Sequence, residues 1–259
     1  MIPDYVAGHS LLAGRTVVVT AAAGAGIGAA VVRRCLEEDA RAVVLGDVHK
    51  RRLDEAVETL RGEFGPARVT GVLCDVTSED DVEALLTAAE PFGGVDVLVN
   101  NAGLGGTASI LDMTDDQWSR VLDITLTGTM RCTRAAARRL VNSGRAGVIV
   151  NNASVVGWRA QEGQAHYAAA KAGVMALTRC AALDLAPHGI RVNAVSPSLA
   201  MHPFLAKVTS DEVLAELTAR EAFGRAAEPW EVANVVVFLA SDYSSYLTGE
   251  VVSVSSQHP

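Results

Sequence analysis

The stretch TVVVTAAAGAGIG, residues 16–28, decides the architecture of this chain. Its first five residues form an apolar, β-branched run that predicts a buried strand, and a helical pattern begins near residue 26. Between them Gly24, Gly26, Ile27 and Gly28 make a turn in which the backbone can approach an anionic group closely. The first N–H groups of the helix would point toward that group. Glycines also occur in plain tight turns. It is the position of this glycine cluster between a predicted strand and a predicted helix that indicates a site for an anionic group.

Short apolar runs alternate with longer helical patterns along the rest of the chain. The runs are nearly continuous, which is typical of strands buried on both faces of a parallel sheet. They lie at residues 16–20, 42–46, 68–74, 95–100, 148–151, 190–195 and 251–254. Helical patterns lie at residues 26–38, 51–64, 79–91, 115–142, 164–187 and 230–241, the fourth beginning with a capping box of Thr114 and Gln117. We therefore expect one α/β domain over residues 1–259, a Rossmann-type doubly wound parallel sheet of seven strands with helices on both faces.

One segment, residues 198–224, breaks this alternation between the sixth and seventh strands. Ligands of a doubly wound sheet bind beyond the carboxyl ends of its strands. We therefore expect the inserted loop and helix to form a lid over a substrate.

The charge balance excludes some classes of partner. With 22 basic and 30 acidic residues the formal net charge is −8, which argues against a general nucleic-acid or acidic-membrane binder. Residues 16–32 are uncharged but short for a membrane span and rich in Gly and Ala. The first ten residues lack a basic segment, so we expect no signal peptide and a cytoplasmic protein. The four cysteines form no C-x-x-C pair and are expected to be reduced core thiols.

An acidic residue, Asp47, closes the second predicted strand 19 residues after Gly28. At that spacing a carboxylate can accept hydrogen bonds from the ribose hydroxyls of a bound dinucleotide and would repel a ribose phosphate. The sequence therefore favours NAD(H). Lys50, Arg51 and Arg52 follow closely, either as the exposed start of a helix or as phosphate ligands, so NADP(H) stays an alternative.

Polar residues also follow the third and fourth predicted strands. Asp75, before Val76, could accept from an adenine amino group or cap the next helix. Asn101, Ala102 and Gly103 end the fourth strand, and the Asn101 side chain could brace the strand ends and the cofactor ribose.

Tyr167 and Lys171 are four residues apart on a predicted helix and therefore share one face. Ser154 precedes Tyr167 by 13 residues and follows the fifth strand. A Tyr-x-x-x-Lys pair is common by chance. Its combination with Ser154, the glycine loop and Asn101 is poorly explained by chance.

From residue 16 to residue 254 the sequence resembles the short-chain dehydrogenase/reductase family. The resemblance rests on the glycine loop, Cys74-Asp75-Val76, Asn100-Asn101-Ala102-Gly103, Ser154, Tyr167 with Lys171, and Arg191-Val-Asn193-Ala-Val-Ser-Pro197. It implies a homotetramer and metal-free hydride transfer between a nicotinamide and a CH–OH group, with Pro197 and Lys171 beside the nicotinamide.

The chemistry of such a site follows from charge. Reduction of a ketone leaves negative charge on its oxygen, which must receive a proton. Tyr167 is the expected general acid and base, and Ser154 is expected to donate a hydrogen bond to the oxygen. The ordinary tyrosine pKa is about 10, and Lys171⁺ with an oxidised nicotinamide is expected to lower it.

The chain departs from the family pattern in three places. Thr125 stands where the family has an asparagine that holds a water for proton relay, so its catalytic role is open. The glycine loop is one residue longer than usual. Where the family has Pro-Gly, this chain has Pro197-Ser198, and where the family has a threonine that anchors the nicotinamide amide, it has His202. His202 could serve as that anchor, as a substrate contact or as an ordinary lid residue.

Residues after Ser154 should line the substrate pocket, namely Val156, Trp158 and Arg159. Trp158 could pack on an alicyclic body or in an interface, and Arg159 could meet a carboxylate or phosphate. Residues 157–161, 166–180 and 241–259 resemble an actinobacterial branch of the family that acts on steroid-derived (C/D ring) acyl-CoA thioesters in cholesterol breakdown. In particular, Ser255-Ser256-Gln257 replaces the family's usual Asp-Gly-Gly.

Two other functions stay open at this stage. One is reduction of a linear 3-oxoacyl thioester, and the other is a catalytically inactive cofactor-binding regulator. The long apolar helices at residues 115–142 and 164–187 could also form the seam of a dimer or tetramer, although packing on the sheet explains many of the same residues.

Overall fold

The seven predicted strands form one parallel sheet in the computed structural model, which describes residues 2–201 and 211–257. The strand order is β3-β2-β1-β4-β5-β6-β7. It reverses between β1 and β4, so the carboxyl ends of these two strands open a crevice. The strands are β1 (Thr16–Thr20), β2 (Ala42–Asp47), β3 (Val69–Leu73), β4 (Val97–Asn100), β5 (Gly147–Asn152), β6 (Ile190–Pro197) and β7 (Val251–Val254). The predicted fold class is confirmed.

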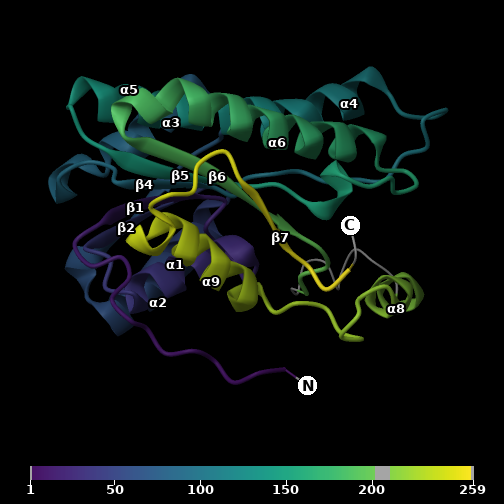
Figure 1. The fold of residues 1–259 in the computed structure, drawn as a ribbon, viewed down its shortest axis with the longest axis horizontal. Helices are drawn as coiled ribbons and strands as arrows, with labels where there is room; N and C mark the ends of the chain where they lie inside the picture. Colours follow the sequence, from purple (N-terminus) through teal and green to yellow (C-terminus); the bar gives the residue numbers. More distant parts are fainter. Residues whose placement is uncertain (1, 202–210, 258–259) are drawn as a thin grey trace.

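Helices cover both faces of the sheet (Figure 1). Successive valines of β1 point to opposite sides, because Val17 and Val19 join one buried cluster and Val18 joins the other. One face is covered by α1 (Ile27–Glu37), α2 (Lys50–Phe64) and α9 (Pro229–Ala240). The other face is covered by α3 (Glu79–Thr87), α4 (Asp115–Leu122), α5 (Gly128–Asn142) and α6 (Ala165–Leu185). In the inserted segment, α8 (Asp211–Ala219) lies at one end of the molecule.

Two predicted helices are shorter than their patterns indicated. The pattern at 115–142 contains a π-helical turn, Asp123–Thr127, between α4 and α5. Thr125 in this turn forms hydrogen bonds with the backbone of Leu104, and such wide turns often occur at functional sites. The pattern at 79–91 ends at Thr87 and is followed by a 3-10 turn, Glu90–Phe92.

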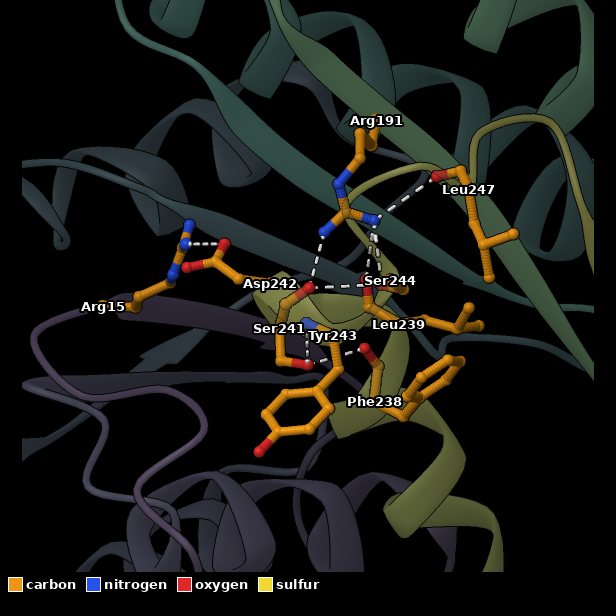
Figure 2. A network of polar contacts seen from close by, with 9 residues as sticks. All are labelled: Arg15, Arg191, Phe238, Leu239, Ser241, Asp242, Tyr243, Ser244 and Leu247. Carbon is orange, nitrogen blue, oxygen red and sulfur yellow. Dashed lines mark hydrogen bonds and ion pairs between the residues drawn. The ribbon is translucent and has the colours of Figure 1, made fainter.

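Arg191 on β6 fixes the turn that leads from α9 to β7 (Figure 2). Its Nη1 donates to the Leu239 carbonyl at 3.1 Å and to Ser244 Oγ at 3.0 Å, and its Nη2 donates to the Ser241 carbonyl at 2.9 Å. A cation at a helix C-terminus is favourable because the last carbonyls there have no helical partners. The Arg191 side chain therefore directs the chain into β7 and its C-terminal tail.

The prediction of four core thiols is wrong for Cys180. The other three cysteines are buried, whereas Cys180 on α6 is exposed. Thr178, Ala181 and Ala182 occupy the sheet-facing side of that helix, so residue 180 points away from it. In the part of the chain that the structure describes, no helix has the length and hydropathy needed to cross a membrane.

Candidate active site

A cavity of about 760 Å³ lies at the carboxyl ends of the strands. Its volume is in the usual range for a small-molecule site. It is lined by residues of the glycine loop, the strand ends, α6, the inserted segment and the C-terminal tail, among them Ala21, Gly26, Ile27, Gly28, Asn101, Gly103, Asn152, Ser154, Tyr167, Lys171, Pro197 and Gln257.

The glycine loop is held tightly against the end of β4. Asn101 Nδ2 donates to the Ala21 carbonyl at 3.0 Å, and Thr20 Oγ1 accepts from the N–H groups of Asn101 and Ala102. A Cβ at Gly28 would lie 2.2 Å from the Ala21 oxygen, so only glycine fits there. The N-terminus of α1 has no side-chain cap and no acidic residue in its first turn, so its N–H groups are available to an anion.

Asp47 is buried at the end of β2 with its carboxylate under the glycine loop. Oδ2 accepts from the Ala23 N–H at 3.0 Å and Oδ1 accepts from the His49 N–H at 2.9 Å. Burial raises the pKa of Asp47. The neighbouring bases Lys50 and Arg51 lie on the exposed side of α2. Each forms an ion pair four residues along that helix.

Asp75 and Val76 do not line the cavity. Asp75 is exposed, and its Oδ1 accepts from the backbone N–H and the hydroxyl of Thr77, so it stabilises the turn before α3 and does not cap that helix as the alternative expected. Ser78 is the residue that caps α3. Val76 is buried against Gly128, where a Cβ would lie 2.6 Å from Val76 Cγ2.

Ser154, Tyr167 and Lys171 meet on one wall of the cavity. The Lys171 Nζ lies 5.6 Å from the ring centroid of Tyr167 and donates to the Asn152 carbonyl. Lys171 is 3 % exposed, and burial lowers its pKa to about 8.

The pKa of Tyr167 differs from the sequence-based expectation. Burial raises this pKa, and the hydrogen bond with the Ser154 hydroxyl lowers it by less. The reason is that a buried phenolate loses its hydration. The chain by itself therefore keeps Tyr167 protonated.

Thr125 is buried behind the cavity wall. Its hydroxyl accepts from the Leu104 N–H at 3.0 Å and donates to the Leu104 carbonyl at 3.2 Å. Its own carbonyl accepts from Thr129 Oγ1 at 2.8 Å. Gly103 lies close to Lys171, because a Cβ there would be 3.5 Å from Lys171 Nζ and 3.7 Å from Thr125 Oγ1. The Thr125 hydroxyl thus holds the loop after β4.

Asn152 is a site residue that the sequence argument missed. Its carbonyl accepts from Lys171, and its Nδ2 donates to Asn101 Oδ1 at 2.9 Å. Since Asn101 in turn donates to Ala21, three hydrogen bonds connect the Lys171 ammonium with the glycine loop. Asn152 Oδ1 is buried without a partner among the described residues. The only signal in the sequence is a second asparagine in an otherwise apolar strand.

The residues expected to contact substrate are spread over several environments. Val156 and Arg159 line the cavity. Trp158 does not line it and is 43 % exposed. His202 lies outside the described residues. Residues of the inserted segment and of the tail that the sequence did not single out also line the cavity, namely Leu199, Leu217, Arg220 and Gln257.

Comparison with known proteins places these features in a family. The sequence profile described as "Enoyl-(Acyl carrier protein) reductase" matches residues 21–256. The chain is 61 % identical over 99 % of its length, and 98 % of the relative's, to the (5R,7aS)-5-hydroxy-7a-methyl-1-oxo-2,3,5,6,7,7a-hexahydro-1H-indene-carboxyl-CoA reductase of Mycobacterium tuberculosis. It is 45 % identical, over 93 % of its length and 94 % of the relative's, to the cis-4-hydroxycyclohexanecarboxylate dehydrogenase of Sinomonas cyclohexanicum. The crystal structure of a short chain dehydrogenase from Mycobacterium smegmatis is 56 % identical, with a TM-score of 0.88 over 100 % of this chain and 99 % of that one.

Proposed function

Because the chain belongs to the short-chain dehydrogenase/reductase family, we propose that it interconverts a secondary alcohol and a ketone on an alicyclic ring that carries an acyl-CoA thioester. The observation that carries this proposal is the meeting of Ser154, Tyr167 and Lys171 in one cavity with the glycine loop. Groups able to transfer a proton thus lie beside a turn suited to a dinucleotide.

A nicotinamide dinucleotide, which supplies or accepts the hydride when bound, fits the residues present. The uncapped N-terminus of α1 suits a pyrophosphate, and Gly28, where a side chain would clash with Ala21 and Asn101, lets the glycine loop pack against that N-terminus. The unpartnered Asn152 Oδ1 offers a buried acceptor in the same cavity, which a hydroxyl group could satisfy. The residues that would hold the cofactor are Gly26, Ile27, Gly28, Asn101, Gly103, Lys171 and Pro197, which line the cavity, together with Gly24, which lies in the glycine loop outside it.

We favour NAD(H) over NADP(H). The Asp47 carboxylate would repel a phosphate on the adenosine ribose. Of the three bases that could attract that phosphate, Lys50 and Arg51 are engaged with Asp54 and Glu55 at 2.8 Å and 2.9 Å, whereas Arg52 lies near the Asp47 carboxylate. Turnover measured with both cofactors tests this preference, and more efficient use of NADPH would contradict it.

Proton transfer falls to Tyr167. In reduction its phenol donates a proton to the ketone oxygen, and in oxidation the phenolate takes the proton back. The Ser154 hydroxyl donates a hydrogen bond to the same oxygen as negative charge develops there. Lys171⁺ stabilises the phenolate, and positive charge on the bound cofactor would act in the same direction. Together these charges oppose the rise in pKa that burial imposes on Tyr167.

The substrate class follows from the cavity and from two relatives. The walls combine apolar Val156, Leu199 and Leu217 with basic Arg159 and Arg220. Such a mixture suits an apolar ring with an acyl group at one end. The names of the two relatives describe a hydroxylated ring bearing a carboxyl-CoA and one bearing a carboxylate.

The test is an NADH absorbance assay with 4-oxocyclohexanecarboxyl-CoA and acetoacetyl-CoA. A higher kcat/KM for the cyclic ketone supports the proposal. A higher value for acetoacetyl-CoA would favour the linear 3-oxoacyl-thioester reductase instead. Retained NADH binding without turnover of any ketone or alcohol would indicate an inactive cofactor-binding protein.

We also propose that the chain forms a homo-oligomer. Leu183 on α6 and Tyr246 before β7 are 77 % and 100 % exposed, and a second copy would remove such apolar side chains from water. Light scattering after size-exclusion chromatography tests this, and a monomeric mass at micromolar concentration would contradict it.

A further inference from the structure

The C-terminal tail contributes a side chain, Gln257, to the cavity wall. The tail leaves β7 toward α8 (Figure 1), and the Ala222 N–H donates to the Ser256 carbonyl at 3.2 Å. There Gln257 lies between two charged groups. Its Oε1 accepts from Arg159 Nη1, and its Nε2 donates to Glu221 Oε1 at 2.7 Å. One amide thus connects the loop after β5 with the segment that follows α8.

Glu221 anchors this bridge. Glu221 is 4 % exposed, and its carboxylate accepts from Ser256 Oγ at 2.7 Å and from the Leu199 N–H at 3.3 Å, as well as from Gln257. These donors stabilise the buried negative charge. The tail, the base of the lid and the cavity wall are therefore joined through one carboxylate.

The charges at its two ends orient the Gln257 amide. Its oxygen must face the guanidinium and its NH₂ must face the carboxylate, because the reverse arrangement would place donor against donor and acceptor against acceptor. This orientation holds Arg159 at the cavity wall. Because Arg159 Nη1 is engaged by Gln257 and Nε is buried, Nη2 is the guanidinium nitrogen that the described residues leave to donate to a ligand in the cavity.

We propose that Arg159, held by Gln257 and Glu221, binds the acyl oxygen of the ring substrate, and that Gln257 is a positioning residue that makes the enzyme select acyl-bearing rings. The group that Arg159 would bind is an oxygen that accepts a hydrogen bond, in either a free carboxylate or a thioester carbonyl. The inference rests on the proposed function, since it assigns the acyl end of the same substrate. Arg159 would fix the ring while its ketone carbon faces Tyr167 and Ser154.

The test compares three ketones in wild type and in Gln257→Leu: 4-oxocyclohexanecarboxyl-CoA, 4-oxocyclohexanecarboxylate and cyclohexanone. We expect Gln257→Leu to raise KM for the two acyl-bearing ketones about tenfold, the effect of losing a hydrogen bond to a charged group, with kcat within about twofold. The kcat/KM for cyclohexanone should stay within about twofold. An equal loss on all three ketones, or no loss on any, would overturn the proposal.

A double-mutant cycle separates positioning from simple packing. Arg159→Met should raise KM for the acyl-bearing ketones at least as much as Gln257→Leu, and the double variant should be no worse than Arg159→Met alone. Additive effects would show that Gln257 does not act through Arg159 and would refute its role.

Two further measurements keep the result decisive. NADH binding followed by fluorescence should be unchanged, which shows that the variant is folded.

If Gln257→Leu does not fold, Gln257→Glu replaces it, because this side chain keeps its length but repels Glu221 and neutralises Arg159. We expect Gln257→Glu to impair the free carboxylate more than the thioester if the ligand is an anion, and both equally if it is a carbonyl, whereas unchanged KM values for both would refute the site. If wild type reduces none of the three ketones, the proposed function itself fails, whereas an active wild type with an unaffected variant contradicts only this inference.

Discussion

The buried ammonium of Lys171 leads to a quantitative prediction about stability. Burial lowers its pKa from 10.5 to about 8, which corresponds to about 3 kcal/mol at about 1.4 kcal/mol per pH unit. Because the pKa is lower in the folded state, the folded chain binds fewer protons than the unfolded chain between pH 8 and pH 10.5. The contribution of Lys171 to the free energy of unfolding therefore rises with pH across that window.

The perturbation is Lys171→Met, which keeps a long side chain and removes the charge. From pH 7 to pH 9.5 we expect the free energy of unfolding of wild type to gain about 2 kcal/mol relative to this variant. The difference between the two proteins is needed because burial also raises the pKa of Cys35, Cys74 and Cys132, which lowers stability as the unfolded thiols ionise above about pH 9. Absolute stabilities are less useful, since the variant leaves the Asn152 carbonyl without its donor.

Urea denaturation at several pH values measures this slope, and NMR identifies its source. The chain has three lysines, Lys50, Lys171 and Lys207, so ¹³C-lysine labelling gives a simple spectrum. We expect one resonance to titrate near pH 8 and to be missing in Lys171→Met. Equal pH slopes in the two proteins, or a Lys171 midpoint at or above pH 10, would refute the reasoning from burial.

Three further substitutions test the site and the fold. Tyr167→Phe should keep NADH binding but lose at least about a hundredfold in kcat, since the phenol carries the proton; an active variant would remove Tyr167 from the mechanism. Asn152→Ala breaks the link to the glycine loop, so NADH affinity measured by fluorescence should fall about tenfold, and an unchanged affinity would show that the link is idle. Arg191→Met strips donors from buried carbonyls and should lower the free energy of unfolding by about 2–4 kcal/mol in urea. The exposed pair of Arg15 supplies the control, because Arg15→Met should cost less than about 1 kcal/mol, and equal losses would count against the role of Arg191.

Agreement between sequence and structure is closest where the signal is local. The strand at 16–20 and the capping box at Thr114 depend on residues within a few positions, and both are observed as expected. The break between α4 and α5 shows the limit of such signals. Helical periodicity continues through Thr125, but its hydroxyl bonds with Leu104, which lies 21 residues earlier, and no periodic pattern encodes that contact.

The sequence by itself determined the sheet, the glycine turn and the pairing of Tyr167 with Lys171, because continuous apolar runs, backbone freedom and helical spacing act over short distances. Only the tertiary structure decided which groups contact Lys171 and Arg159. It placed the Asn152 carbonyl on the Lys171 ammonium and brought Gln257 to Arg159, 98 residues away along the chain. Long-range contacts of this kind depend on the order of the strands in the sheet and on the direction in which the tail leaves β7. The residues that surround the Lys171 ammonium and the Arg159 guanidinium therefore become visible only after folding.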